Sequence, residues 1–221
     1  MFTFPTTFFW GNLSNWLLTG LVAYYGLDSN ANDAHWSNDW TGVSVTRDTS
    51  IKIVGTASAS FPTTSNKIDF SNFTVNDNFT INLWLRFAWT SVGFVYSSRT
   101  SASLNEVVSI YVQSGNVLFT WWGTDSPSQS WFNDSSWHMA TLTKDWTTYK
   151  YYMDSVYEWT FTNSNVINTL ENVWLWYLRF NNSFKYNWRI DEFGVRDTPL
   201  TDTQITTLYN GWSWLAYSDF V

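Results

Sequence analysis

The sequence predicts an all-β protein, an antiparallel β-sandwich with one short helix close to its C-terminus. Three observations lead to this class. Apolar and polar residues alternate, with β-branched and aromatic enrichment, in about a dozen short segments. Turn-forming clusters of Asn, Asp, Ser, Thr and Gly separate these segments. No helical pattern alternates with them, so two antiparallel sheets are expected to pack face to face.

The expected strands follow the alternation along the chain. In the first half they are Leu21–Leu27, Gly42–Thr46, Ala57–Phe61, Lys67–Phe70, Thr80–Phe87, Gly93–Ser98, Val107–Gln113 and Asn116–Trp121. In the second half they are Trp137–Lys144, Thr148–Met153, Glu158–Phe161, Val173–Leu178 and Arg189–Arg196. Seven apolar side chains on these strands are expected in the core: Leu83, Leu85, Val107, Ile110, Leu118, Leu142 and Val195.

The last strand and the helix come from one continuous stretch. Residues 190–195 alternate with the period of a strand, with Asp191 and Glu192 on opposite faces. Thr201 and Gln204 have the spacing of a capping box, and Asn210 with the following glycine is a C-terminal stop signal. We therefore expect the principal helix over Thr201–Asn210.

Composition limits the classes of function. A chain of 221 residues can form one sandwich domain, and it contains no cysteine. Its net charge of -7 disfavours nucleic acid as a partner. The first basic residue is Arg47, so no positively charged leader is seen, and no apolar run is long enough to span a membrane. With 13% charged residues, the composition suits an extracellular or virion protein.

Several motifs resemble one known family. Leu21–Asp33 resembles its opening strand and first loop, Phe79–Arg86 its strand reading FTISFWVK, and Ser136–Leu142 its WHHVA motif. Two further segments follow in the same order as in the family, namely Lys144–Asp154 and the ending of one strand plus one helix. The chain thus resembles the laminin-G-like jellyroll domains of the concanavalin-A-like lectin and glucanase superfamily. The resemblance implies a jellyroll domain over residues 21–221, after an N-terminal extension of residues 1–20.

Tryptophan is unusually common, with 17 Trp and only 10 Gly. Several tryptophans stand where the family, or a tight turn, has glycine: Trp36, Trp40, Trp146, Trp159, Trp188, Trp212 and Trp214, with Trp16, Trp131, Trp174 and Trp176 fitting the same substitution. One interpretation is a gene from a lineage that reads UGA as glycine, translated here with tryptophan. The alternative is a natural aromatic surface that binds glycans. Recoding predicts exposed or loop positions for Trp36, Trp40, Trp146, Trp212 and Trp214, whereas Trp84 and Trp137 should be buried.

The first loop is the candidate metal site. It gathers Asp28, Asn30 and Asp33, and calcium prefers several oxygen ligands. The resemblance implies a calcium ion that joins this loop to Asp191 on the last strand. The alternative is a loop of ordinary turn-forming residues, with Asp191 accepting hydrogen bonds from backbone N–H groups.

Catalysis is not expected. Glycosidases need two suitably spaced carboxylates, and the glucanase branch carries them as Glu-x-Asp-x-Glu. The glutamates of this chain match no such pattern: Glu106, Glu158, Glu171 and Glu192. His138 follows a core tryptophan on a strand and is expected to be structural, and His35 lies in the first loop.

Binding is the expected function. Trp121 and Trp122 are candidates for an aromatic sugar platform, with packing in the core as the alternative. Asn181, Asn182 and Tyr186 form a second polar loop. The leading expectation is a non-catalytic adhesion module for a glycan or a surface protein, on a phage particle or bacterial surface and possibly within a larger assembly. A purely structural role comes second and a glycoside hydrolase third.

Overall fold

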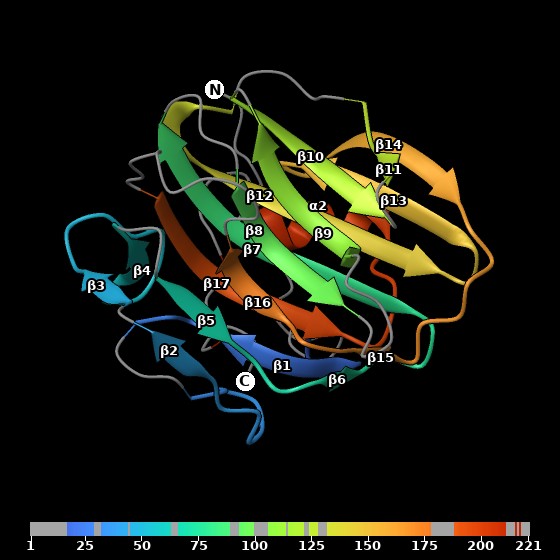
Figure 1. The fold of residues 1–221 in the computed structure, drawn as a ribbon, viewed down its shortest axis with the longest axis horizontal. Coiled ribbons are helices and arrows are strands. Elements are labelled where there is room, and N and C mark those ends of the chain that lie inside the picture. Colours follow the sequence, from blue (N-terminus) through green and yellow to red (C-terminus); the bar gives the residue numbers. More distant parts are fainter. Residues whose placement is uncertain are drawn as a thin grey trace, which may run out of the picture.

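The protein is an antiparallel β-sandwich with a short helix on one side, as a computed structural model shows (Figure 1). The expected all-β class is confirmed. The structure describes residues 17–28, 32–43, 45–62, 66–88, 93–99, 106–113, 115–121, 124–127, 132–177, 188–210, 215 and 217.

One layer, called sheet A here, has eight strands. Its order is β14 (Val156–Thr162), β13 (Thr148–Met153), β12 (Asp134–Asp145), β7 (Phe79–Ala88), β17 (Trp188–Arg196), β4 (Ser58–Phe61) and β3 (Thr46–Asp48). The eighth strand, β1 (Leu21–Tyr25), also pairs with β17. The first and the last described strands are therefore direct neighbours.

The other layer, sheet B, has seven strands. Its order is β11 (Thr124–Asp125), β10 (Asn116–Trp121), β9 (Glu106–Gln113), β8 (Gly93–Arg99), β16 (Trp174–Tyr177), β5 (Lys67–Asp69) and β2 (Thr41–Val43). A separate two-stranded sheet joins β6 (Phe73–Thr74) to β15 (Thr169–Leu170). All pairings among these strands are antiparallel.

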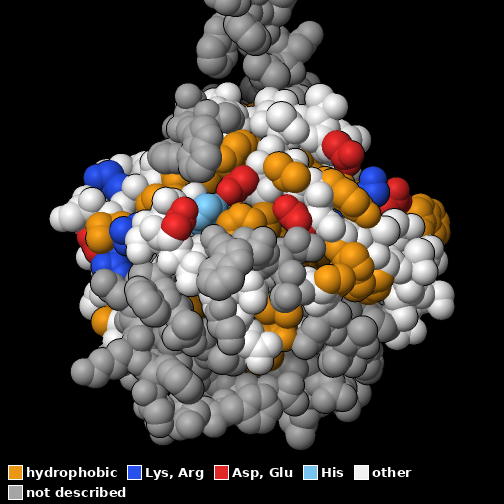
Figure 2. Space-filling view, turned by 90° about the horizontal axis from the view of Figure 1, so that it is seen from above, with side chains coloured by type: hydrophobic (Ala, Val, Ile, Leu, Met, Phe, Trp, Pro, Cys, Tyr) orange, Lys and Arg blue, Asp and Glu red, His pale blue; other side chains and the backbone are white. Residues whose placement is uncertain are grey.

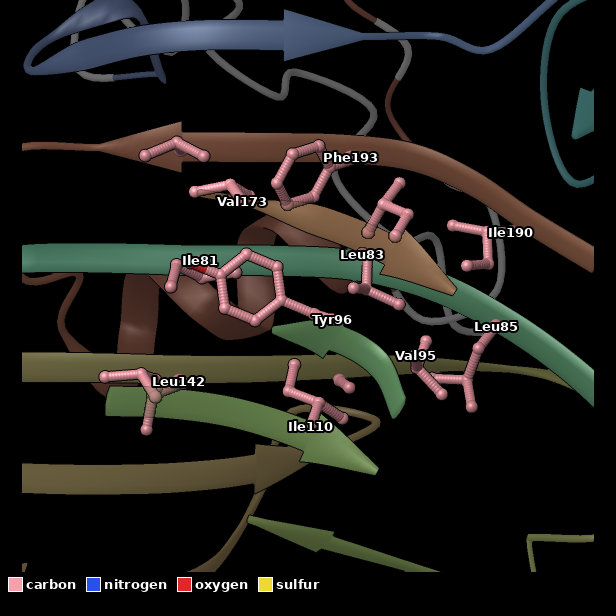
Figure 3. Close-up of a cluster of buried hydrophobic side chains, with 14 of the residues drawn as sticks. Ile81, Leu83, Leu85, Val95, Tyr96, Ile110, Leu142, Val173, Ile190 and Phe193 are labelled. Carbon is pink, nitrogen blue, oxygen red and sulfur yellow. The ribbon is translucent and has the colours of Figure 1, made fainter. Parts of the chain in front are cut away.

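The core lies between sheets A and B, where side chains of both layers interdigitate (Figure 3). Five of the seven expected core residues are buried there: Leu83, Leu85, Ile110, Leu142 and Val195. Leu118 is also buried, but it belongs to a separate small cluster with Phe94 and Tyr111. The side chain of Val107 lies outside the described part.

The structure differs from the expected strands mainly at short elements. The single strand expected over Gly42–Thr46 is two short strands, β2 and β3, which belong to different sheets. The two-residue strands β6, β11 and β15 were not expected. Two residues are too few to show a period of two, so alternation cannot reveal them.

Helix α2 (Asp202–Tyr209) has the predicted capping box, in which Thr201 and Gln204 bond reciprocally. Its buried side chains, Ile205, Leu208 and Tyr209, pack on the outer face of sheet A, where the Tyr209 ring stacks on Trp84 at a centroid distance of 5.5 Å. This packing, more than helix propensity, stabilises so short a helix. Among the described residues, the structure has no helix of the length and hydrophobicity needed to cross a membrane.

Strand β17 contains a β-bulge that corrects one expectation. Its pairing with β7 shifts register between Asp191 and Gly194, and Glu192 has φ +51°. Ile190 and Phe193 both face the core between the sheets, which strict alternation would forbid. Asp191 and Glu192 were expected on opposite faces, and this was wrong: the bulge turns both toward the outer face of sheet A.

The tryptophan positions agree only in part with the recoding interpretation. Trp84 and Trp137 are buried, and Trp36 and Trp146 are exposed, as expected. Trp40, expected to be exposed or in a loop, lies in the loop before β2 but is buried against the core, with the Arg47 guanidinium 5.2 Å from its ring. Trp188 is fully buried and stacks on Phe87, a packed position rather than a turn. Trp212 and Trp214 lie outside the described residues.

Trp146 is the position where glycine would fit best. It follows Asp145 in the two-residue turn between β12 and β13, has φ +51° and is 71% exposed. Its N–H donates to Asn78 Oδ1 at 2.8 Å. A side chain costs about 1–2 kcal/mol in this left-handed region, and an exposed indole offsets little of that cost.

We expect Trp146→Gly to raise the melting temperature by a few degrees, because relief of backbone strain exceeds the added freedom of the unfolded chain. Trp146→Ala is the control, since it removes the indole but keeps the Cβ atom, and should give no such rise. A lower melting temperature for the glycine variant would show that the indole stabilises the fold. Mass spectrometry of the protein from its natural source tests recoding itself, because tryptophan at position 146 contradicts that interpretation.

Candidate functional site

The pairing of β1 with β17 brings together acidic residues from distant parts of the sequence. Asp28 follows β1, and Asp191 and Glu192 lie in the bulge of β17. The segment 53–57 runs beside both, because its backbone N–H groups donate to Asp28 and to Asp191. We call Asp28, Asp191 and Glu192 the first acidic cluster.

Asp191 is the most deeply buried of them. Its side chain is fully buried, and Oδ2 accepts a hydrogen bond from the Ile53 N–H at 3.0 Å. Oδ1 is also buried and makes no hydrogen bond of regular geometry within the described part of the chain, although the Val54 N–H also acts on this carboxyl. Burial, the charge of Glu192 and then that of Asp28 raise the pKa of Asp191 to about 9, against the opposing effect of backbone N–H donors. Asp191 is therefore protonated at neutral pH unless a cation compensates its charge.

Glu192 and Arg47 complete this environment. The Tyr24 hydroxyl donates to Glu192 Oε2, and burial followed by the charge of Glu192 raises the pKa of Tyr24. Burial lowers the pKa of the Arg47 guanidinium, although Asp28 and Asp191 act in the opposite direction. A cationic side chain close to these carboxylates reduces their repulsion without removing it.

Asp28 and Asp33, both expected as metal ligands, have different surroundings. Asp28 Oδ1 accepts from the Thr56 N–H, from Thr56 Oγ1 at 3.1 Å and from the Ala57 N–H at 2.8 Å. Asp33 is buried and organises its own loop, with Oδ1 accepting from the N–H groups of Tyr24 and His35 at 2.9 Å. Asn30 lies outside the described residues.

These residues fit a calcium ion only in part. The buried Oδ1 of Asp191, with Asp28 and Glu192 close by, is a suitable start for an oxygen-ligand site. In contrast, Asp28 Oδ1 and both oxygens of Asp33 are already used by protein donors. Across the ranges that the structure describes, no three His, Cys, Asp or Glu side chains gather closely enough to hold a metal ion.

A second charged cluster surrounds His138 on β12. Its Nδ1 lies 2.7 Å from Asp154 Oδ2, and its Nε2 lies 3.0 Å from Asp134 Oδ1. The face drawn in Figure 2 shows a histidine next to acidic side chains. Burial lowers the pKa of His138, but the hydrogen bonds and charges of Asp154 and Asp134 outweigh it and raise the pKa.

The contacts of this cluster leave neither ring nitrogen of His138 free to activate a nucleophile. Both imidazole nitrogens face carboxylates, so the doubly protonated ring satisfies both contacts at once. Asp154 also fixes the turn into β14, because its Oδ1 accepts from the Met139 N–H at 2.8 Å. His35, in the first loop, has Nδ1 3.0 Å from the Tyr217 hydroxyl.

The expected aromatic and polar binding residues fall mostly outside the described part. Trp121 ends β10, but its side chain is not described, and Trp122, Asn181, Asn182 and Tyr186 lie outside the described residues. Sequence reasoning missed Glu192 and Arg47 as neighbours of Asp191. Gly194, at the end of the bulge, was the one local signal that could have indicated it, whereas Arg47 is far from Asp191 along the chain.

Comparisons with known proteins support the fold class. The binding domain of Paraclostridial Mosquitocidal Protein 1 superposes with a TM-score of 0.69 at 14% identity, covering 87% of this chain and 52% of that domain. A second neighbour is a botulinum neurotoxin type C structure, concerned with cell entry that depends on two ganglioside molecules. It superposes with a TM-score of 0.71 at 15% identity, covering 88% of this chain and 52% of the neurotoxin chain. The botulinum neurotoxin type G receptor-binding domain superposes with a TM-score of 0.65 at 13% identity, covering 87% of this chain and 51% of that domain.

The chain therefore spans about half the length of these neighbours. At such low identity the likeness concerns the fold alone. No protein-family model matches the sequence. No curated protein matches it either.

Proposed function

We propose that the protein is a non-catalytic binding module of the laminin-G-like type, exposed on a phage particle or a bacterial surface, where it attaches to glycans. The observation that carries this proposal is the likeness in fold to receptor-binding domains, one of which interacts with ganglioside molecules. The two acidic clusters support a non-catalytic role, because hydrogen bonds within the protein already hold His138 and Asp28 in place.

Calcium is the second part of the proposal. A cation bound at Asp191 Oδ1 would compensate the buried charge that otherwise requires a proton. Calcium supplies only charge and coordination here. The chain contributes the bulge that presents Asp191 and Glu192 on one face, and the segment 53–57 that orients Asp28.

The whole chain should bind at least one arrayed oligosaccharide and leave it intact. The measurement is fluorescence of the labelled protein on immobilised glycans, followed by chromatography of the same glycans after prolonged incubation. Binding without shortened products supports an adhesion module. Shortened products would support a glycoside hydrolase, and no binding would favour a purely structural role.

A further inference from the structure

A groove of about 620 Å³ lies between the β12–β13 hairpin and the segment that leads into α2. Its volume is within the roughly 300–1,000 Å³ of small-ligand sites. On the hairpin side, Asp145 pairs with Thr148 across the turn, and Lys150 follows on the same face. Tyr149, between them, is fully buried in the core, so these three polar side chains face the groove together.

The opposite side combines two apolar residues with polar groups. Pro199 provides most of the apolar surface, beside the largely buried Leu200, and Asp202 and Thr203 open the first turn of α2. The buried Tyr152 donates its hydroxyl to Asp202 Oδ1 at 2.6 Å, and Lys150 Nζ lies 3.7 Å from the same oxygen. Asp202 is thus an acceptor that a buried tyrosine holds in a set position, on an otherwise exposed helix end.

This lining favours a polyhydroxylated ligand without charge. Two carboxylates against one ammonium group give the groove a slight negative charge, and the chain as a whole carries -7. An anion would be repelled, and a purely apolar ligand would leave polar groups desolvated. Sugar hydroxyls can donate to the carboxylates and accept from Lys150 and the threonines, while a sugar C–H face can contact Pro199.

We infer that this groove binds a neutral oligosaccharide. The inference rests on the proposed function and narrows it, because it assigns the binding site and excludes sialylated and sulfated glycans as preferred ligands.

The experiment compares the intact protein with three variants on arrayed neutral, sialylated and sulfated oligosaccharides, and then titrates the best neutral binder by calorimetry. Lys150→Ala removes the ammonium donor, and Thr203→Trp fills the groove from an exposed helix position. Lys67→Ala is the matched control. Lys67 has a similarly exposed side chain, 40% against 44% for Lys150, and pairs with Asp69 at 2.8 Å on the other sheet. Melting curves confirm that each variant is folded.

We expect the neutral glycans to bind best, Lys150→Ala to weaken binding about tenfold, Thr203→Trp to abolish it, and Lys67→Ala to leave it unchanged. Unchanged binding by the folded groove variants would overturn the inference while leaving the proposed function intact. Preferred binding of sialylated or sulfated glycans would overturn the assigned ligand class. No binding of any glycan by the intact protein would overturn the proposed function, and the inference with it.

Discussion

Replacing Asp191 with asparagine is expected to raise the melting temperature of the metal-free protein at neutral pH and to abolish its response to calcium. In chelator, the buried Asp191 takes up a proton on folding, because its pKa is raised to about 9. The unfolded chain keeps this carboxyl ionised at pH 7, so protonation on folding costs on the order of 4 kcal/mol. Asparagine is neutral in both states and removes this cost.

The pH dependence has a defined sign. Because folding raises the pKa of Asp191, its contribution to stability is fully present below the ordinary pKa of an aspartate. That contribution is lost as the pH rises toward about 9. The asparagine variant should lack this part of the decline. Thermal melting between pH 4 and 9, roughly the window between the two pKa values, measures the difference.

Calcium gives the second measurement on the same pair of proteins. An ion that binds only the folded state raises the melting temperature of the wild type with its concentration. The asparagine variant has lost the anionic ligand and should not respond. A wild type that melts identically in calcium and in chelator, but keeps the pH slope, would show that Asp191 carries a proton and that calcium has no site here.

The sequence predicts the regular parts of this fold well, for a physical reason. Strands such as β7 and β12 are long, so alternation of apolar and polar residues appears over enough positions to be recognised, although both faces of these strands are largely buried. The capping box of α2 is a local signal, and the structure has it at the expected residues. In contrast, whether Trp40 is exposed depends on Arg47 and on core side chains that only the folded chain brings near.

The sites were less predictable, because they depend on contacts between distant residues. Tyr152 and Asp202 are 50 positions apart and meet only because α2 folds back onto sheet A. No pattern within either segment indicates the groove between them. The meeting of Asp28 with the last strand was predictable only through the family resemblance, which implies that the first and last strands are neighbours. The bulge at Glu192 was not predictable from alternation, because it interrupts that pattern.

Replacing His138 with glutamine is expected to destabilise the protein by about 2 kcal/mol near pH 6, because Asp134 and Asp154 then lose a charged partner. The imidazole is buried and contacts both carboxylates, and Phe132 packs edge-on against it at a centroid distance of 4.9 Å. Glutamine retains a polar group of similar length but cannot carry the charge.

The destabilisation should be largest at intermediate pH and should become smaller toward both acidic and alkaline pH. Folding raises the pKa of His138, so its contribution is fully present below the ordinary histidine pKa of about 6.5 and is lost as the pH rises through the raised value. Burial alone would raise the pKa of Asp134. The hydrogen bond with His138 is the largest of several contacts that outweigh burial, so the pKa of Asp134 is lowered overall. Its contribution therefore disappears as the pH falls below about 4. The difference between wild type and variant should be largest between these limits.

Both proteins are best compared in the Asp191→Asn background, which removes one further group whose stability contribution declines with rising pH. Chemical denaturation at pH 3, 5.5 and 9 then isolates the His138 cluster. We expect the free-energy difference at pH 5.5 to exceed the differences at both extremes. An equal loss at all three values would mean that the imidazole stabilises β12 by packing against Phe132, and that its charge contributes nothing to folding.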